Sequence, residues 1–503
     1  MIILQNVKLV LYLAASLLVV TAGLYLRIQN SDARIFHSDE AVQAYQLWEL
    51  METGYYEYDP EDKHGPILYY LASVLNKILG IDASELTHTQ VRLLPILASI
   101  GLLLLVLVSE RKVNGTSLIA AALFALSPFP VIYSAYYVQE ILFTLIGFLL
   151  LYSANEYWKL PSSMNAARCG LWIGLFFATK ETAIIHLAAI GLAVVSIQSN
   201  ALEFKVWSER IRLKQILFAF GSTAFIWGFF FSATFTDFSG IVDSFKTFVF
   251  YAERSQGLGH EKPLYYYLSI FWPQRAEGIR WGEAPFLILA AIGFFLLIRD
   301  SREASQHVRL SVFYGFTCFV LYSIIPYKTP WLMLTTYVSF CIAAGFTLVT
   351  LFTRWPQILV RIAVVGVTLL VLLDQYQSTR LVERYAADSR NPYIYQHTSP
   401  QFEKLIKRID DLEALDPSSD LAIAVGGSDN AWPLPWYLRN NDTIGYWQNP
   451  SDIPALDIVI GPIGKLPQSL NETHIAEYHG LRENVVLECW IEKRLWDAFM
   501  ETR

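Results

Sequence analysis

Long apolar runs separated by short polar segments make up the first three quarters of the chain. A bilayer core of ~30 Å requires about 20 apolar residues in helical form, and ten runs are close to that length. A shorter run over 169–178 ends at the polar tetrad 179–182, and we interpret it as one further span. The pattern predicts a polytopic α-helical membrane protein with eleven transmembrane helices, over 8–26, 92–109, 116–135, 141–158, 169–178, 183–198, 215–235, 284–298, 310–326, 331–352 and 358–374.

Composition agrees with this pattern. Charged side chains are 17% of the 503 residues, whereas a soluble domain carries about a quarter, and hydrophobic side chains are 54%. These values exclude a soluble enzyme, a disordered chain, a coiled coil and a disulfide scaffold. The net charge of −7 gives no basic surface for nucleic acid. The four cysteines form no CxxC pair, so a zinc or iron–sulfur site is not expected.

The distribution of Lys and Arg predicts the orientation, since short cytoplasmic loops are enriched in them. With the N-terminus in the cytoplasm, the loop 27–91 is extracytoplasmic and holds eleven acidic but only four basic residues. We therefore expect a multi-pass protein of the cell membrane with an extracytoplasmic C-terminal region. The basic residues of the cytoplasmic loops are then Arg111, Lys112, Lys159, Arg168, Lys205, Arg210, Arg212, Lys214, Arg299, Arg302, Arg309 and Arg354.

The chain becomes polar after residue 374. Short β-like runs over 421–425, 444–447 and 458–460 follow a helical stretch over 400–414, with Gly, Asn, Asp and Pro between them. We predict a transmembrane domain over 1–374 and a small extracytoplasmic α/β domain over 375–503. Two large outer loops belong to the first domain: 27–91, which carries interfacial helices, and 236–283.

Acidic residues on the predicted outer side are candidates for catalysis. Asp39 and Glu40 follow the first span, and Glu140 lies at the outer start of another one. A carboxylate at a membrane exit is costly unless it faces water, a cation or a partner, and it can take a proton from a hydroxyl group. The alternative for Asp39 and Glu40 is an acidic, solvated start of the loop.

Cations of the same side could hold a lipid phosphate. The alternative for Lys63 and His64 is ordinary anchoring in the membrane interface, and Lys180 could simply pair with Glu181. The candidates for the donor phosphate are Lys63, His64, Arg92, Lys180 and Lys328. Residues expected to line the substrate cavity are His37, Tyr69, Tyr136, Tyr137, Glu181, Tyr327 and Trp331.

The order of these motifs resembles the GT-C class of polyprenyl-phosphate-sugar-dependent glycosyltransferases, especially its protein O-mannosyltransferase and aminoarabinose-transferase branch. It is similar to a prokaryotic subgroup described as associated with flippase activity. The motifs span about residues 8–350. They are Asp39–Glu40, His64–Gly65–Pro66–Ile67–Leu68–Tyr69–Tyr70, Arg92, Ser127–Pro128, Tyr136 to Glu140, Thr179–Lys180–Glu181–Thr182 and Pro326–Tyr327–Lys328–Thr329–Pro330–Trp331.

The resemblance implies a dolichyl- or undecaprenyl-phosphate sugar as donor, and a protein, lipid or glycan as acceptor on the outer side. It assigns the role of catalytic base to Asp39, with transfer expected to invert the anomeric carbon. The family's phosphate-binding Lys lies in a Lys-Pro-Pro-Leu-like stretch, which here reads His64–Gly65–Pro66–Ile67, so either Lys63 or His64 contacts the phosphate. No cofactor and no divalent metal are expected, because the first loop contains no Asp-x-Asp motif.

Two other readings belong to different functional classes. A transporter or flippase for lipid-linked sugars would suit the broken helix at 179–182, although no repeat is visible in the sequence. A non-catalytic accessory factor could keep the same scaffold.

Overall fold

In the computed structural model, the described residues are 2–29, 31–61, 63–109, 115–197, 211–254, 261–299, 304–415, 421–427 and 431–503. Their contacts divide the chain into two compact units. The helical unit comprises 1–31, 54–79 and 89–384, and the sheet unit comprises 32–53, 80–88 and 385–503. This division differs from a boundary at residue 374, because two pieces of the first outer loop group with the C-terminal residues.

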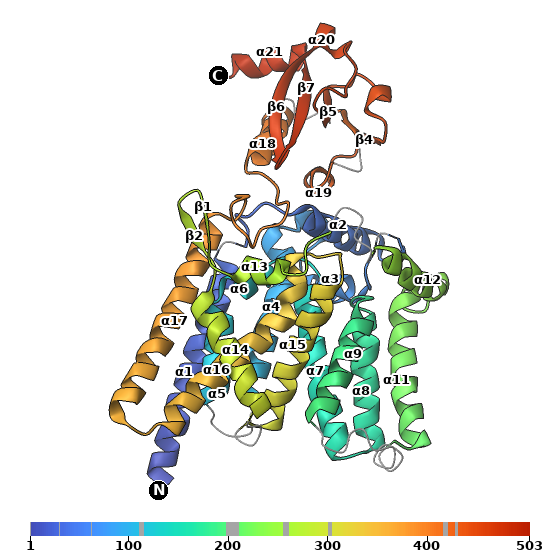
Figure 1. Cartoon of the computed structure of the whole chain (residues 1–503). Helices are drawn as coiled ribbons and strands as arrows, with labels where there is room; N and C mark the ends of the chain where they lie inside the picture. The colour runs from blue at the N-terminus through green and yellow to red at the C-terminus, as the bar shows by residue number, and fades with distance from the viewer. Residues whose placement is uncertain are drawn as a thin grey trace. The chain divides into compact units, whose positions relative to one another are not determined.

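The helical unit is a bundle of helices with one short β-hairpin (Figure 1). Its elements are α1 (Ile2–Ile28), α3 (Ile67–Ile78), α4 (His88–Val108), α5 (Gly115–Leu126), α6 (Pro128–Tyr133), α7 (Glu140–Lys159), α8 (Ser163–Phe177), α9 (Ala183–Ile197), α11 (Leu213–Phe231), α12 (Ser239–Arg254), α13 (Tyr266–Phe271), β1 (Gln274–Ala276), β2 (Ile279–Trp281), α14 (Ala284–Arg299), α15 (Gln306–Ile324), η2 (Pro330–Met333), α16 (Leu334–Arg354) and α17 (Ile358–Arg384).

Each of the eleven apolar runs is helical. Within the described part of the chain, seven helices are long and apolar enough to cross a membrane, and α5, α9 and α14 are shorter apolar helices. Several predicted spans had wrong limits: the run 116–135 breaks between α5 and α6, α8 begins six residues before 169, α11 ends four residues before 235, and α17 continues ten residues past 374. Five of the predicted cytoplasmic basic residues, namely Arg111, Lys112, Lys205, Arg210 and Arg302, lie outside the described residues.

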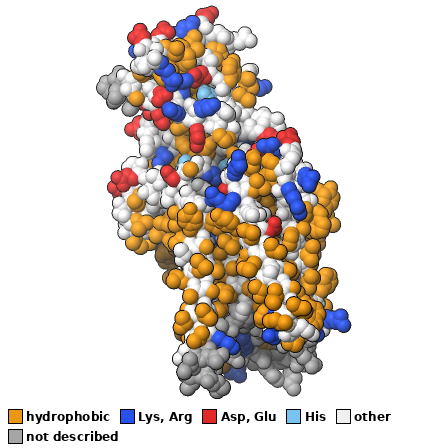
Figure 2. Space-filling view, turned by 90° about the vertical axis from the view of Figure 1, so that its left-hand side faces the viewer, with side chains coloured by type: hydrophobic (Ala, Val, Ile, Leu, Met, Phe, Trp, Pro, Cys, Tyr) orange, Lys and Arg blue, Asp and Glu red, His pale blue; other side chains and the backbone are white. Residues whose placement is uncertain are grey.

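The sides of the helical unit are apolar. Leu17 and Leu18 of α1 are 68% and 71% exposed, and Leu359 and Leu370 of α17 are 77% and 66% exposed. Hydrophobic side chains accordingly form a broad surface along these helices (Figure 2). A contiguous apolar surface of this kind is unfavourable in water but suits lipid acyl chains. The surface supports a multi-pass membrane protein.

A buried arginine stabilises the break between α5 and α6. Pro128 begins α6 and disfavours helical geometry at the residue before it, which leaves the last carbonyls of α5 without helical partners. Arg27 of α1 donates hydrogen bonds to the carbonyls of Phe124 and Ala125, at 3.2 Å each, and to Ser99 Oγ at 2.8 Å. The fully buried guanidinium therefore caps α5.

We expect the substitution Arg27→Met to lower the free energy of unfolding by about 2 kcal/mol, because carbonyls of α5 lose a charged donor in a buried place. Thermal unfolding of the purified protein in detergent measures the change. Arg354→Met is the matched control, since Arg354 is exposed at the end of α16. Equal unfolding temperatures for the two variants would contradict the capping role.

The sheet unit contains a mixed five-stranded sheet in the order β4-β3-β5-β7-β6. Strands β3 (Ile423–Gly426), β4 (Ile444–Trp447) and β5 (Ile458–Pro462) are parallel, whereas β6 (His474–Arg482) and β7 (Val485–Glu492) form an antiparallel hairpin that joins β5 through β7. The helical elements of the unit are α2 (Ser38–Thr53), η1 (Ala83–Glu85), α18 (Gln401–Glu413), α19 (Leu434–Tyr437), η4 (Pro450–Asp452), α20 (Leu470–Thr473) and α21 (Lys493–Glu501).

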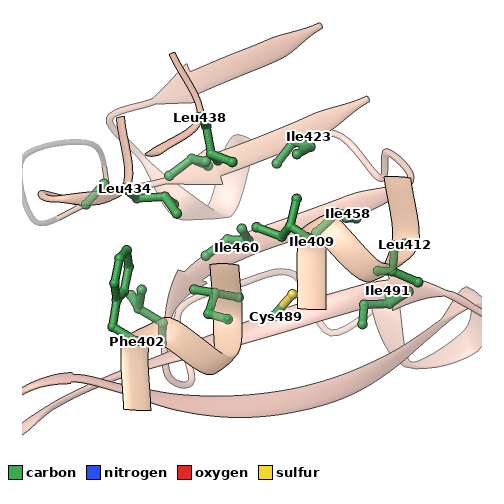
Figure 3. Packing of buried hydrophobic residues seen from close by; sticks show 14 of the residues in the cluster. Phe402, Ile409, Leu412, Ile423, Leu434, Leu438, Ile458, Ile460, Cys489 and Ile491 are labelled. Atoms are coloured by element: carbon green, nitrogen blue, oxygen red, sulfur yellow. The ribbon is translucent and has the colours of Figure 1, made fainter. Parts of the chain in front are cut away.

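The core of this unit lies between α18 and the sheet. Phe402, Ile409 and Leu412 of α18 are buried in this core. Ile409 lies near Ile458 and Leu412 lies near Ile491, whereas Phe402 lies at the other end, on the side of Leu434 (Figure 3). The spacing of these helical residues places them on one face, which the sheet covers. The predicted helix over 400–414 and the three predicted strands are confirmed, and the predicted α/β domain therefore has a core of its own.

Candidate functional site

A buried ion pair joins two helices of the helical unit. Glu140 is the first residue of α7, and Lys180 lies in the turn between α8 and α9. The ammonium group of Lys180 donates to Glu140 Oε1 at 2.6 Å, and both side chains are less than a tenth exposed. The N-terminus of a helix also favours a carboxylate, so Glu140 is stabilised from two directions.

The same turn places a second carboxylate next to a histidine. The carboxylate oxygens of Glu181 lie 3.0 and 3.1 Å from Nδ1 of His64, and the hydroxyl of Tyr251 lies 3.0 Å from the same nitrogen. Tyr251 comes from α12, which runs across the end of α11 (Figure 1). Four ionisable groups, Glu140, Lys180, Glu181 and His64, are thus brought together from three distant segments.

The alternative in which Lys180 pairs only with its neighbour Glu181 is wrong, since each takes another partner. Burial alone would favour the neutral amine of Lys180, but Glu140 and Glu181 outweigh it and raise the pKa of Lys180. Burial likewise opposes the charge of Glu181, yet His64 and Lys180 together lower the pKa of that carboxyl group. Lys180 and Glu181 are therefore both favoured in their charged forms.

A glycine lets the histidine reach this turn. The loop before α3 packs directly on the end of α8, where the backbone N–H of Ile67 donates to the carbonyl of Ala178 at 3.1 Å. A Cβ atom on Gly65 would overlap that carbonyl. The close approach of the two backbones requires glycine at position 65, and it places His64 against Glu181.

We expect Gly65→Ala to separate His64 from Glu181, because the loop must move away from Ala178 to accommodate a methyl group. The variant should have a lower unfolding temperature and should lose any activity that depends on His64. Thermal unfolding measures the first effect and a sugar-transfer assay measures the second. Gly366→Ala is a suitable control, since Gly366 of α17 has open space around its Cα. A variant as stable and active as this control would contradict the packing argument.

In the sheet unit, the adjacent carboxylates Asp39 and Glu40 have different environments. Glu40 is fully buried, accepts a hydrogen bond from the backbone N–H of His37 at 3.2 Å and lies 4.0 Å from Arg34. Its carboxylate therefore accepts a hydrogen bond from the backbone N–H just before α2. The Asp39 side chain is 52% exposed and so remains accessible to solvent or a ligand.

Hydrogen bonds on both ring nitrogens orient His37 beside Asp39. Its Nδ1 accepts a hydrogen bond from the backbone N–H of Asp39 at 3.0 Å, so the proton is on Nε2, which donates to the carbonyl of Tyr395 at 2.8 Å. Arg482 of β6 interacts electrostatically with Asp39. Burial lowers the pKa of Arg482, and the charge of Asp39 counteracts this shift.

The other predicted cations contact backbone carbonyls. Lys63 donates to Glu57 at 3.0 Å, and its ammonium group lies 5.5 Å from the ring centre of Tyr56. Arg92 is fully buried and donates to Ser31 at 2.6 Å. Lys328 is also buried and donates to Lys262 at 3.1 Å and to Ile325. Their contact with a donor phosphate stays a prediction.

The predicted aromatic residues of the helical unit are mostly buried. Tyr69 stacks on Tyr56 with ring centres 4.9 Å apart, and Tyr137 donates to the carbonyl of Leu68 at 3.5 Å. Tyr327 interacts electrostatically with Lys180. Tyr136 and Trp331 both pack against Tyr133, at 5.2 and 5.9 Å. That these aromatic residues and Asp39 line one substrate cavity stays a prediction.

Sequence reasoning missed Tyr251, Arg482 and a polar chain inside the bundle. His186 of α9 contacts two buried tyrosines of α15, with Nδ1 2.6 Å from the Tyr314 hydroxyl and Nε2 3.0 Å from the Tyr322 hydroxyl. A histidine in an apolar helix was the available signal for this network. Among the described residues, no group of three or more His, Cys, Asp or Glu side chains could hold a metal ion.

Comparison with known proteins identifies the fold. No family model matches the sequence, and no curated protein matches it. The solved structure of ArnT from Cupriavidus metallidurans in the apo state aligns with a TM-score of 0.61 at 14% identity, over 96% of this chain and 97% of that one. ArnT bound to undecaprenyl phosphate aligns with a TM-score of 0.59 over the same shares.

A second match is the archaeal oligosaccharyltransferase AglB from Archaeoglobus fulgidus, in complex with an inhibitory peptide and a dolichol-phosphate. Its TM-score is 0.54 at 12% identity, over 97% of this chain and 77% of that one. The chain therefore has the same fold as ArnT and AglB, and the predicted helical bundle with a small C-terminal sheet domain is confirmed.

Proposed function

We propose that this protein is a membrane glycosyltransferase that moves a monosaccharide from a polyprenyl-phosphate donor to a protein, lipid or glycan acceptor on the extracytoplasmic side. The observation that carries the proposal is the buried cluster of Glu140, Lys180, Glu181 and His64 within a fold shared along nearly the whole length of ArnT. ArnT has been solved with undecaprenyl phosphate and AglB with a dolichol-phosphate, so the donor is proposed from the same class of lipid.

The proposed reaction is a single displacement at the anomeric carbon. The acceptor oxygen forms a bond to this carbon, the bond to the phosphate oxygen breaks, and its electron pair leaves with the phosphate. Asp39 takes the proton of the acceptor hydroxyl as general base, which suits an exposed carboxylate that caps no helix. One displacement inverts the anomeric configuration.

The donor phosphate is proposed to contact His64 rather than Lys63. Lys63 already donates to a carbonyl and lies over Tyr56, whereas His64 uses only Nδ1 for Glu181 and Tyr251. Within the part of the chain that the structure describes, Nε2 of His64 has no hydrogen-bond partner. Lys180 contributes positive charge next to Glu181, because Glu140 and Glu181 favour its charged form.

The test is release of polyprenyl phosphate from labelled undecaprenyl- and dolichyl-phosphate sugars by the purified protein in vesicles. Membrane and peptide extracts serve as acceptors, and empty vesicles serve as the control. We expect sugar transfer together with release of the lipid phosphate. Translocation of the intact donor without release would instead support a flippase, and neither activity would support an accessory factor.

A further inference from the structure

His64 and Glu181 form a carboxylate–imidazole pair whose outer nitrogen is available. Because a carboxylate only accepts hydrogen bonds, Nδ1 of His64 carries a proton and donates a hydrogen bond to Oε2 of Glu181 at 3.1 Å, with Oε1 of the same carboxylate 3.0 Å away. The hydroxyl oxygen of Tyr251 shares this N–H at 3.0 Å. Both contacts fix the ring by the same nitrogen, and Nε2 points to neither partner.

Exposure agrees with this orientation. The side chain of His64 is 20% exposed, whereas Glu181 is only 5% exposed. The carboxylate is therefore almost inaccessible to solvent, and the ring is the part of the pair that a ligand can reach. Carboxylate–histidine pairs with this arrangement set both the tautomer and the direction of the outer nitrogen.

Charged groups surround the His64 ring and its carboxylate partner. Among the described residues, Glu181 contacts the ring, Lys180 acts on Glu181 from the same turn after α8, and Lys63 is next to His64 in its own loop. The hydroxyl in contact with the ring is that of Tyr251 on α12. Lys180 already neutralises Glu140. A proton on Nε2 would place an imidazolium in direct contact with the carboxylate of Glu181, which Lys180 also stabilises.

We propose that His64 is a proton donor to the leaving phosphate and that Glu181 is its positioning residue, an inference that rests on the proposed glycosyl transfer. As the bond from the anomeric carbon to the phosphate oxygen breaks, the electron pair stays on that oxygen, which takes the proton from Nε2. His64 becomes neutral and keeps its Nδ1–H on Glu181. Water on the outer side returns the proton after the lipid phosphate leaves.

The first measurement is the affinity of the purified protein for undecaprenyl phosphate, without any acceptor, between about pH 6 and about pH 9, the range around which histidine loses its charge. We expect the wild-type affinity to fall by about tenfold toward high pH, the worth of one charged hydrogen bond. The phosphate itself gains charge as pH rises, so a titration of the ligand alone would strengthen binding instead.

Variants assign this effect to the pair. His64→Lys keeps a charge over the whole range, so its affinity should not fall toward high pH. Glu181→Gln keeps an acceptor but loses the charge, so the fall should move to lower pH, and Glu181→Asp should restore it in part. His307→Gln removes a histidine at the start of α15 and should behave like the wild type.

The outcomes separate this inference from the proposed function. A fall in affinity that persists in His64→Lys, or a wild-type affinity that does not fall, overturns the role of His64 but leaves glycosyl transfer possible. Failure to bind undecaprenyl phosphate or to release it from any donor, at every pH, overturns the proposed function itself. A pH effect on transfer that disappears in His64→Lys and moves to lower pH in Glu181→Gln supports the inference.

Discussion

The substitution Asp39→Asn is expected to lower the rate of sugar transfer by about a thousandfold, the usual contribution of a general base. Asparagine has nearly the same shape but cannot accept the proton of the acceptor hydroxyl. The backbone N–H of residue 39 still reaches Nδ1 of His37, and the exposed side chain supports no buried contact, so the fold should not change. Release of polyprenyl phosphate measures the rate.

Glu52→Gln is the matched control for this variant. Glu52 is an exposed carboxylate near the other end of α2, so the two substitutions remove the same charge from the same helix. We expect Glu52→Gln to retain the wild-type rate and both variants to unfold at the wild-type temperature. Retained transfer in Asp39→Asn, with the wild-type dependence on acceptor concentration, would refute the role of Asp39 as base.

The second large effect is expected for Lys180→Met. The substitution leaves Glu140 buried without its cation, and removal of one partner from a buried pair costs about 3–5 kcal/mol. It also removes the positive charge behind His64 and Glu181, so transfer should be lost as well. Equilibrium unfolding in detergent reports the first effect and polyprenyl phosphate release the second.

The double variant Glu140→Gln, Lys180→Met separates structure from function. With both charges removed, no isolated buried charge remains, so most of the stability should return. Transfer should stay low, because the cation is still missing. Recovery of both stability and transfer would show that Lys180 serves only to neutralise Glu140.

The spans could be predicted because lipid imposes a long apolar run on every crossing helix. The end of α17 was missed because its last turns, after Asp374, are polar while still helical. The α5–α6 break was present in the sequence as Ser127–Pro128, but the apolar run hides it. The β6–β7 hairpin also had a signal in the sequence, namely an asparagine, which tolerates the positive φ of a tight turn. In the structure this residue, Asn484, has a φ of 60°.

The candidate site could be predicted only as a set of residue types. The tetrad 179–182 and the motif at His64 were both recognisable, but 117 residues separate His64 from Glu181, and nothing in the local pattern shows that they meet. Tyr251 lies in an amphipathic helix with no sign of its partner. Asp39 and Glu40 look equivalent in the sequence, whereas burial and hydrogen bonding distinguish them.

The most direct test of the account is an experimental structure of the protein with undecaprenyl phosphate bound. We predict that a phosphate oxygen lies within hydrogen-bond distance of Nε2 of His64, while Nδ1 keeps its contact with Glu181. A phosphate bound away from the cluster of Glu140, Lys180, Glu181 and His64 would contradict the account.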